Sequence, residues 1–172
     1  MKKYNDPLAL GRADPYVYKH TDGYYYFTAT YPAYDRICLR RAKTINGLTD
    51  AEEKIVWRKH ETGIMGSHIW APELHYIDGK WYIYFAAGES ENIWEIRPYV
   101  LECADADPLN GKWTEMGMMQ ALTPPDENTI NGYDRYSFTD FSLDMTTFGH
   151  RGRRYCIWAE KVGRRFGISN LY

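Results

Sequence analysis

The chain has 172 residues, a formal net charge of -2 and 16% aromatic residues, among them 16 Tyr and 6 Trp. So many aromatic side chains exclude a disordered chain, and the lack of a basic excess argues against binding to nucleic acid. No apolar run approaches the roughly 20 residues of a membrane span, so we expect no membrane association. No apolar segment follows Met1 either, and the sequence therefore predicts a cytoplasmic location.

Strand-like runs joined by tight turns dominate the sequence. In chain order they predict three β-hairpins, over residues 14–29, 71–86 and 144–159. Each hairpin turns at a glycine, in two cases within an Asp-Gly pair, which is a strong hairpin signal. The turn glycines are Gly23, Gly79 and Gly152.

Further strands complete each of the first two hairpins. A third strand is expected at 36–42 and at 99–104, and a short fourth segment at 54–57 and at 112–114. Antiparallel units of about four strands that repeat along a chain are typical of a β-propeller.

The length of the repeat decides how much of a propeller is present. The units cover roughly residues 10–65, 66–135 and 136–172, so the chain holds two units and the start of a third. Because propellers close with about four to eight blades, we predict an all-β, incomplete propeller of about two and a half to three blades. The alternative is a self-contained β-sandwich of about nine strands.

The three cysteines predict no covalent framework. Cys38, Cys103 and Cys156 stand in strand-like runs, and no two of them form a CxxC pair. This pattern favours small buried side chains over disulfides or a zinc site, and free thiols agree with a reducing setting.

Two carboxylates occupy matching positions in the repeat. Alignment of the hairpins on their turn glycines places Asp14, Ala71 and Asp144 at the start of each first strand. Because that strand lines the channel of a propeller, Asp14 and Asp144 are expected to point into one funnel. Two carboxyl groups within aromatic walls suit acid–base chemistry on a sugar, although an Asp at a strand start also serves in turns. Asp140 is the alternative inward carboxylate.

Three segments together resemble glycoside hydrolase family 43: GRADPYV at 11–17, HIWAPELHY at 68–76 and FSLDMTTF at 141–148. The resemblance covers nearly the whole chain. It implies a five-bladed β-propeller and an inverting glycosidase that hydrolyses terminal α-L-arabinofuranosyl or β-xylosyl residues of plant-type oligosaccharides. The third segment most resembles the arabinofuranosidase branch.

The resemblance also implies roles for single residues. Asp14 corresponds to the general base, and Asp144 to the carboxylate that orients the general acid and raises its pKa. Trp70, with His68 and Tyr31, is expected to bind the sugar. No cofactor is implied, although a complete propeller can hold a central-channel ion such as calcium.

The general acid of the family is a Glu of a later blade, and no Glu of this chain matches its motif. We therefore expect the 172-residue chain alone to be inactive. The alternatives are a non-catalytic carbohydrate-binding module and a structural fragment. Because open sheets have exposed edges, we also expect the chain to self-associate or to pair with the missing blades.

Two further features leave alternatives open. Glu73 and His75 are two residues apart on an expected strand and should share a face, but two ligands alone do not make a metal site. Trp94 lies in the loop after Gly88, where it is expected either to contact an outer sugar or simply to cover the blade.

Overall fold

The computed structural model describes residues 3–119, 129–130, 133–134, 141–162 and 165–171. These residues form β-strands and loops, with one 3-10 helix, η1 (Asn46–Leu48). None of the described helical segments is long and apolar enough to cross a membrane.

Three antiparallel sheets follow one another along the chain, each with its strands in consecutive order. The first contains β1 (Ala13–Lys19), β2 (Tyr25–Thr30), β3 (Arg36–Ala42) and β4 (Lys54–Arg58). The second contains β5 (Ser67–Ile77), β6 (Lys80–Gly88), β7 (Arg97–Cys103) and β8 (Trp113–Met118). The third contains β11 (Ser142–His150), β12 (Arg153–Val162) and β13 (Arg165–Leu171).

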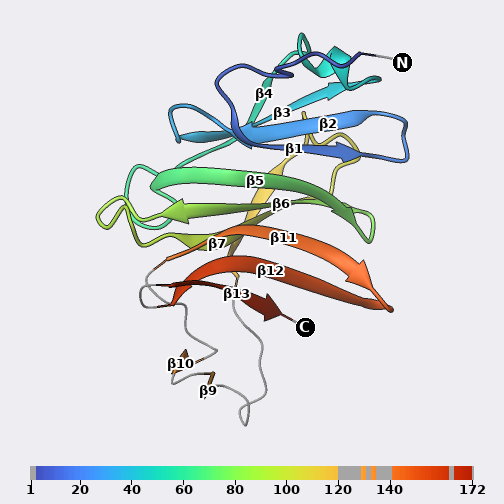
Figure 1. The fold of residues 1–172 in the computed structure, drawn as a ribbon. Helices are drawn as coiled ribbons and strands as arrows, with labels where there is room; N and C mark the ends of the chain where they lie inside the picture. Colours follow the sequence, from blue (N-terminus) through green and yellow to red (C-terminus); the bar gives the residue numbers. More distant parts are fainter. Residues whose placement is uncertain (1–2, 120–128, 131–132, 135–140, 163–164, 172) are drawn as a thin grey trace.

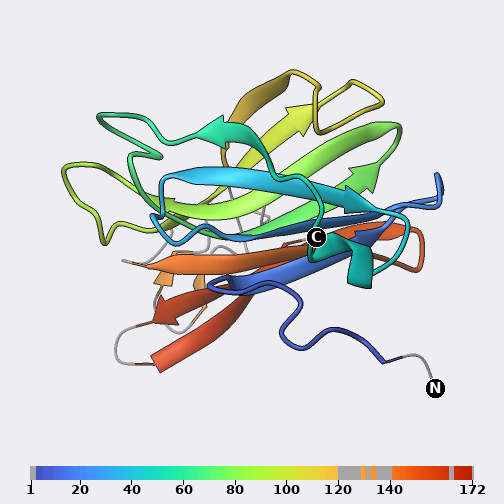
Figure 2. The same cartoon turned by 90° about the horizontal axis from the view of Figure 1, so that it is seen from above.

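The three sheets are stacked face to face, with β1, β5 and β11 as the first strand of each (Figure 1). Seen from above, the N-terminus lies at the periphery of this stack (Figure 2). Such a series of meanders is the arrangement of propeller blades, so we call the sheets blades one, two and three. A separate two-residue pair, β9 (Thr129–Ile130) with β10 (Tyr133–Asp134), was not predicted from the sequence.

The predicted hairpins are confirmed, and the turn residues explain two of them. Asp78 and Gly79 have φ of 48° and 86°, and Arg151 and Gly152 have φ of 48° and 76°. Two central residues with positive φ form the turn that best matches the twist of a two-residue hairpin. The first hairpin has a longer loop, in which Asp22 accepts the Tyr24 N–H at 2.8 Å, and its second strand starts at Tyr25.

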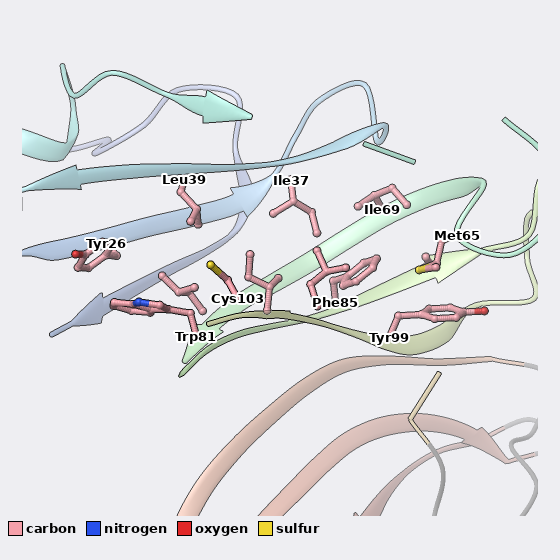
Figure 3. Close-up of a cluster of buried hydrophobic side chains, with 13 residues drawn as sticks. Tyr26, Ile37, Leu39, Met65, Ile69, Trp81, Phe85, Tyr99 and Cys103 are labelled. Atoms are coloured by element: carbon pink, nitrogen blue, oxygen red, sulfur yellow. The ribbon is translucent and has the colours of Figure 1, made fainter. Parts of the chain in front are cut away.

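The main core lies between blades one and two. Alternate residues of β6 point into it, because successive side chains of a strand face opposite ways. Figure 3 shows Ile37 and Leu39 of β3 pointing from blade one toward Phe85 and Cys103 of blade two. The β6 residues of this core are Trp81, Ile83, Phe85 and Ala87.

The opposite face of blade two packs against blade three. There Tyr84 of β6 and Val100 of β7 meet Met145 and Trp158 of blade three, and all four are buried. Blade two is thus covered on both faces, which explains why its middle strands, β6 and β7, are almost continuously buried.

The cysteines are part of this packing. Cys38 and Cys103 are buried and Cys156 is half-buried, and all three are free thiols. Their prediction as small apolar side chains is confirmed for the two buried ones.

Candidate active site

The first strand of each blade carries a β-bulge at the aligned position. In each bulge two residues lie opposite one residue of the neighbouring strand, at Asp14-Pro15, Ala71-Pro72 and Asp144-Met145. The first residue of each pair has a positive φ, 50° at Asp14, 44° at Ala71 and 55° at Asp144. Such values are uncommon outside glycine, although Asp tolerates them better than most residues. Because bulges turn a side chain away from the regular pleat, they set the direction in which the two carboxylates leave the strand.

Thr30 connects the first bulge to the second. Its side chain is buried, with the residue 3% exposed. The hydroxyl donates to Asp14 Oδ2 at 2.7 Å, and its oxygen accepts the Ala71 N–H at 2.8 Å. A backbone N–H can only donate, so the hydroxyl proton of Thr30 is directed to the carboxylate. The orientation of Asp14 is therefore fixed by a residue that is itself held by blade two.

The charges of three carboxyl groups interact between the first strands. The pKa of Asp144 is raised above its ordinary value, first because its carboxyl group is partly buried and then because the negative charges of Asp14 and Glu73 lie nearby. Asp14 and Asp144, which the sequence places in one funnel, are thus within electrostatic reach of each other. The alternative inward carboxylate, Asp140, lies outside the described residues.

Glu73 and His75 share a face of β5, as predicted. His75 Nε2 lies 2.9 Å from Glu73 Oε2, and the His75 ring lies 5.2 Å from the ring of Tyr16 on β1. Burial, and then the charge of Glu73, raises the pKa of Tyr16 to about 12, so its phenol is protonated at neutral pH. Of these side chains, Glu73 lies close enough for its charge to act on Asp144.

The described residues contain no group of three or more His, Cys, Asp or Glu side chains arranged to hold a metal ion. The central-channel ion of a complete propeller therefore stays a prediction.

Trp70 and His68 belong to an aromatic cluster at the start of β5. The His68 ring lies 4.5 Å from that of Trp70 and 4.9 Å from that of Trp94, on which it stacks. Tyr34, from the loop between β2 and β3, lies 5.6 Å from Trp70. The cluster therefore combines two of the predicted sugar-binding residues with two aromatic residues from neighbouring loops.

Tyr31 has different neighbours. It follows Thr30 directly, and its ring lies between the guanidinium groups of Arg12 and Arg36, at 4.6 Å and 4.5 Å. Asp35 holds Arg36 in place through two hydrogen bonds of 2.6 Å. The described ring contacts of Tyr31 are thus with cations of blade one, and not with the Trp70 cluster.

Thr30 and Tyr34 were missed by the sequence analysis. The signal for Thr30 was present in the hairpin register, since Thr30 pairs with Ala13 next to the first bulge. Tyr34 carried no comparable signal, because only the stacking of two blades brings it to Trp70.

A stack of three meander sheets with bulges at matched positions of their first strands is the architecture of a β-propeller. The chain belongs to glycosyl hydrolases family 43, whose model matches residues 4–172. Members of this family form five-bladed β-propellers, and the chain is an incomplete one, so the β-sandwich alternative is wrong.

The relatives are arabinofuranosidases. An extracellular exo-alpha-(1->5)-L-arabinofuranosidase of Streptomyces avermitilis is 54% identical over 169 residues, which make up 98% of this chain and 32% of that protein. A protein of the same name from Streptomyces chartreusis is 52% identical over 157 residues, or 91% of this chain and 43% of that protein. The crystal structure of an alpha-L-arabinofuranosidase from Lactobacillus brevis has a TM-score of 0.80 and 43% identity, and covers 97% of this chain and 51% of that chain.

Two consequences follow from these similarities. The chain is a glycoside hydrolase by resemblance, and it spans between 32% and 51% of the length of these relatives. The predicted cytoplasmic location is wrong, because the two Streptomyces relatives are named extracellular enzymes. The absence of an apolar segment after Met1 was not a valid guide to location.

Proposed function

We propose that this chain supplies the general base and the acid-orienting carboxylate of an inverting α-L-arabinofuranosidase that acts on terminal residues of arabinose-containing oligosaccharides. The observation that carries the proposal is the pair Asp14 and Asp144. Both occupy matched bulges with a left-handed backbone conformation, and their charges interact. The names of the relatives favour arabinosides over β-xylosides.

Asp14 suits the role of general base. Its carboxylate accepts the Thr30 hydroxyl at 2.7 Å, which fixes the orientation of the group that must take a proton from water. In direct displacement with inversion, the water attacks the anomeric carbon while a general acid protonates the leaving oxygen.

Asp144 suits an orienting role. A negative charge at this position raises the pKa of a nearby acid and favours its protonated form at neutral pH. No Glu of the chain matches the family's motif for that acid, so we propose that the 172-residue chain does not turn over substrate by itself.

A chimera tests this function. Residues 1–172 are joined to the rest of the Streptomyces avermitilis relative, which is 54% identical over the shared part and would supply the remaining blades. We expect the chimera to hydrolyse a nitrophenyl α-L-arabinofuranoside, and Asp14→Asn to lower kcat by about 10²–10⁴-fold. The 172-residue chain alone should show no turnover.

Asp78→Asn is the matched control, because Asp78 is an exposed aspartate with a positive φ of 48° in the turn between β5 and β6. It should retain full activity. An active Asp14→Asn chimera would exclude Asp14 as the base. Turnover by the 172-residue chain that Asp14→Asn abolishes would refute its proposed inactivity.

We propose further that the chain associates through its open sheets, because blades one and three lie at the two ends of the described stack (Figure 1). Light scattering on the same preparations tests this, and a monodisperse 20.2 kDa monomer would contradict it.

A further inference from the structure

Arg12 is a charged residue two positions before Asp14, and the protein largely encloses its side chain, which is only 12% exposed. Its Nη2 donates to both carboxylate oxygens of Glu53, at 2.8 Å and 3.0 Å. An exposed ion pair contributes little because water and salt screen it, whereas loss of one partner from an enclosed pair leaves an uncompensated charge. The guanidinium of Arg12 is therefore held against Glu53.

Glu53 is itself held from strand β3. Arg40 Nε donates to Glu53 Oε2 at 3.0 Å. Arg40 Nη1 lies 3.3 Å from the carbonyl oxygens of Leu48 and Thr49, at the end of η1. Burial opposes the ionisation of Glu53, but the hydrogen bonds and charges of Arg12 and Arg40 hold its pKa below the ordinary value. Glu53 is thus an ionised anchor that belongs to the body of blade one.

The second contact of Arg12 leads to the neighbouring strand. Its guanidinium lies over the ring of Tyr31, with the guanidinium carbon 4.6 Å from the ring centre. Ala13 of β1 pairs with Thr30 of β2 in the antiparallel register, and Arg12 and Tyr31 are the next residues beyond this pair. A planar guanidinium can stack on an aromatic face and bind a carboxylate at the same time. Arg12 therefore joins the start of β1 to the end of β2.

These two strand ends carry the general base and the residue that orients it. Thr30 precedes Tyr31 and donates its hydroxyl to Asp14 Oδ2 at 2.7 Å. Asp14 has a φ of 50°, which is uncommon for a residue other than glycine. Because hydrogen bonds between oxygens weaken beyond about 3 Å, this bond requires the two strand ends to keep their relative position.

We propose that Arg12 is a positioning residue for Asp14. It holds the start of β1 against Glu53 and Tyr31. The Thr30 hydroxyl and the Asp14 carboxylate then stay within hydrogen-bond distance of each other. The role of Asp14 as general base rests on the function proposed above, whereas the effect of Arg12 on the Asp14 side chain is measurable without turnover.

The side-chain rotamer of Asp14 in the 172-residue chain tests the proposal. Coupling constants between Hα and Hβ, measured by NMR, distinguish a side chain held in one rotamer from one that averages over several. We expect one rotamer in the parent chain and averaged couplings in Arg12→Ala. Arg12→Lys keeps the charge but loses the planar group, so it should give intermediate couplings. If Arg12→Ala does not fold, the result for Arg12→Lys decides.

Kinetics of the chimera described above give a second measurement. A displacement of about 1 Å at a reacting group can lower a rate by about 10²-fold. We expect Arg12→Ala to lower kcat by about 10–10²-fold and to change KM by less than about threefold. Arg12→Lys should recover part of kcat. A merely structural role of Arg12 would lower the melting temperature without this separation of kcat from KM.

Arg41→Ala is the matched control. Arg41 also pairs with a carboxylate, that of Asp107 at 3.2 Å, and lies over a tyrosine ring, that of Tyr24 at 5.0 Å. It pairs with Tyr26 near the first hairpin turn, at the other end of β2 from Thr30. The substitution should leave the Asp14 rotamer and kcat unchanged.

A single Asp14 rotamer in both Arg12 variants would overturn the proposal, as would averaged couplings in the parent chain or an equal effect of Arg41→Ala. An active chimera in which Arg12→Ala leaves kcat unchanged would also overturn it. The proposed function fails on a separate result, an inactive parent chimera. Averaging of Asp14 in Arg12→Ala together with an inactive chimera would support the positioning role and refute the function.

Discussion

The first strands of blades one and two have the same bulge but carry different side chains on it. Asp14 and Ala71 have almost equal backbone φ, 50° and 44°, yet Asp14 is exposed and Ala71 is buried. Alanine gains nothing from a left-handed conformation, which costs a non-glycine residue roughly 1–2 kcal/mol. The bulge therefore forms in a blade with or without a carboxylate. At Asp14 the same backbone conformation carries a carboxylate of the candidate site.

The two bulges also make different hydrogen bonds to Thr30, which connects them. Blade two donates the Ala71 N–H to Thr30, and blade one uses the same hydroxyl to hold Asp14. The bulge without a carboxylate thus supports the bulge that has one. Blade three repeats the arrangement of blade one, with Asp144 at a φ of 55°.

The largest effect should come from removal of the side chain that lies opposite the second bulge. Phe85 faces Ala71-Pro72 in the strand register, is 0% exposed and lies 5.2 Å from the ring of Trp57. Phe85→Ala should lower the free energy of unfolding by about 3–5 kcal/mol, because it leaves a cavity between blades one and two. Denaturation in urea measures this loss.

Phe148→Ala is the comparison, because the same substitution at a 46% exposed ring should cost less than about 1 kcal/mol. A similarly small loss for Phe85→Ala would mean that the second bulge does not depend on the packing behind it.

Sequence patterns were enough to predict the blades and their matched aspartates. The turn glycines, such as Gly79 and Gly152, fix the hairpins locally, and counting back from them finds Asp14 and Asp144. The link through Thr30 was not predictable in this way, because it joins atoms 41 residues apart on two blades. The stacking of His68 on Trp94 likewise depends on the path of a loop, which alternation does not encode. The location was predicted from the residues after Met1 and not from the strand pattern, and the names of the relatives contradict it.

A smaller effect is expected when the link between the two bulges is cut. Thr30→Val keeps the shape of the side chain but leaves the Ala71 N–H and Asp14 Oδ2 without their partner. The free energy of unfolding should fall by about 1–3 kcal/mol, and kcat of the chimera should fall more than KM changes. Thr30→Ser retains the hydroxyl and should restore most of both. Equal behaviour of the Val and Ser variants would show that the hydroxyl neither holds the bulges together nor positions the base.

The smallest effect concerns the charge that distinguishes blade three from blade two. Partial burial, and then the charges of Asp14 and Glu73, raises the pKa of Asp144 in the folded protein, so ionisation of this group opposes folding. That cost is present at neutral pH and disappears as pH falls through the raised pKa toward the ordinary value of about 4. Asp144→Asn should therefore increase the stability at pH 7 by up to about 0.5 kcal/mol, and the gain should vanish in acid.

Asn tolerates the left-handed φ of 55° at this position, so the substitution changes the charge with little change in backbone strain. Thermal unfolding between pH 3 and pH 8 measures the gain, with Asp78→Asn as the control for an aspartate outside the carboxylate cluster. A loss of stability at pH 7, or a difference that grows in acid, would mean that Asp144 gains more from its local contacts than it loses by repulsion. The carboxylate of blade three would then contribute to folding as well as to the site, whereas the alanine of blade two shows that the bulge itself needs no charge.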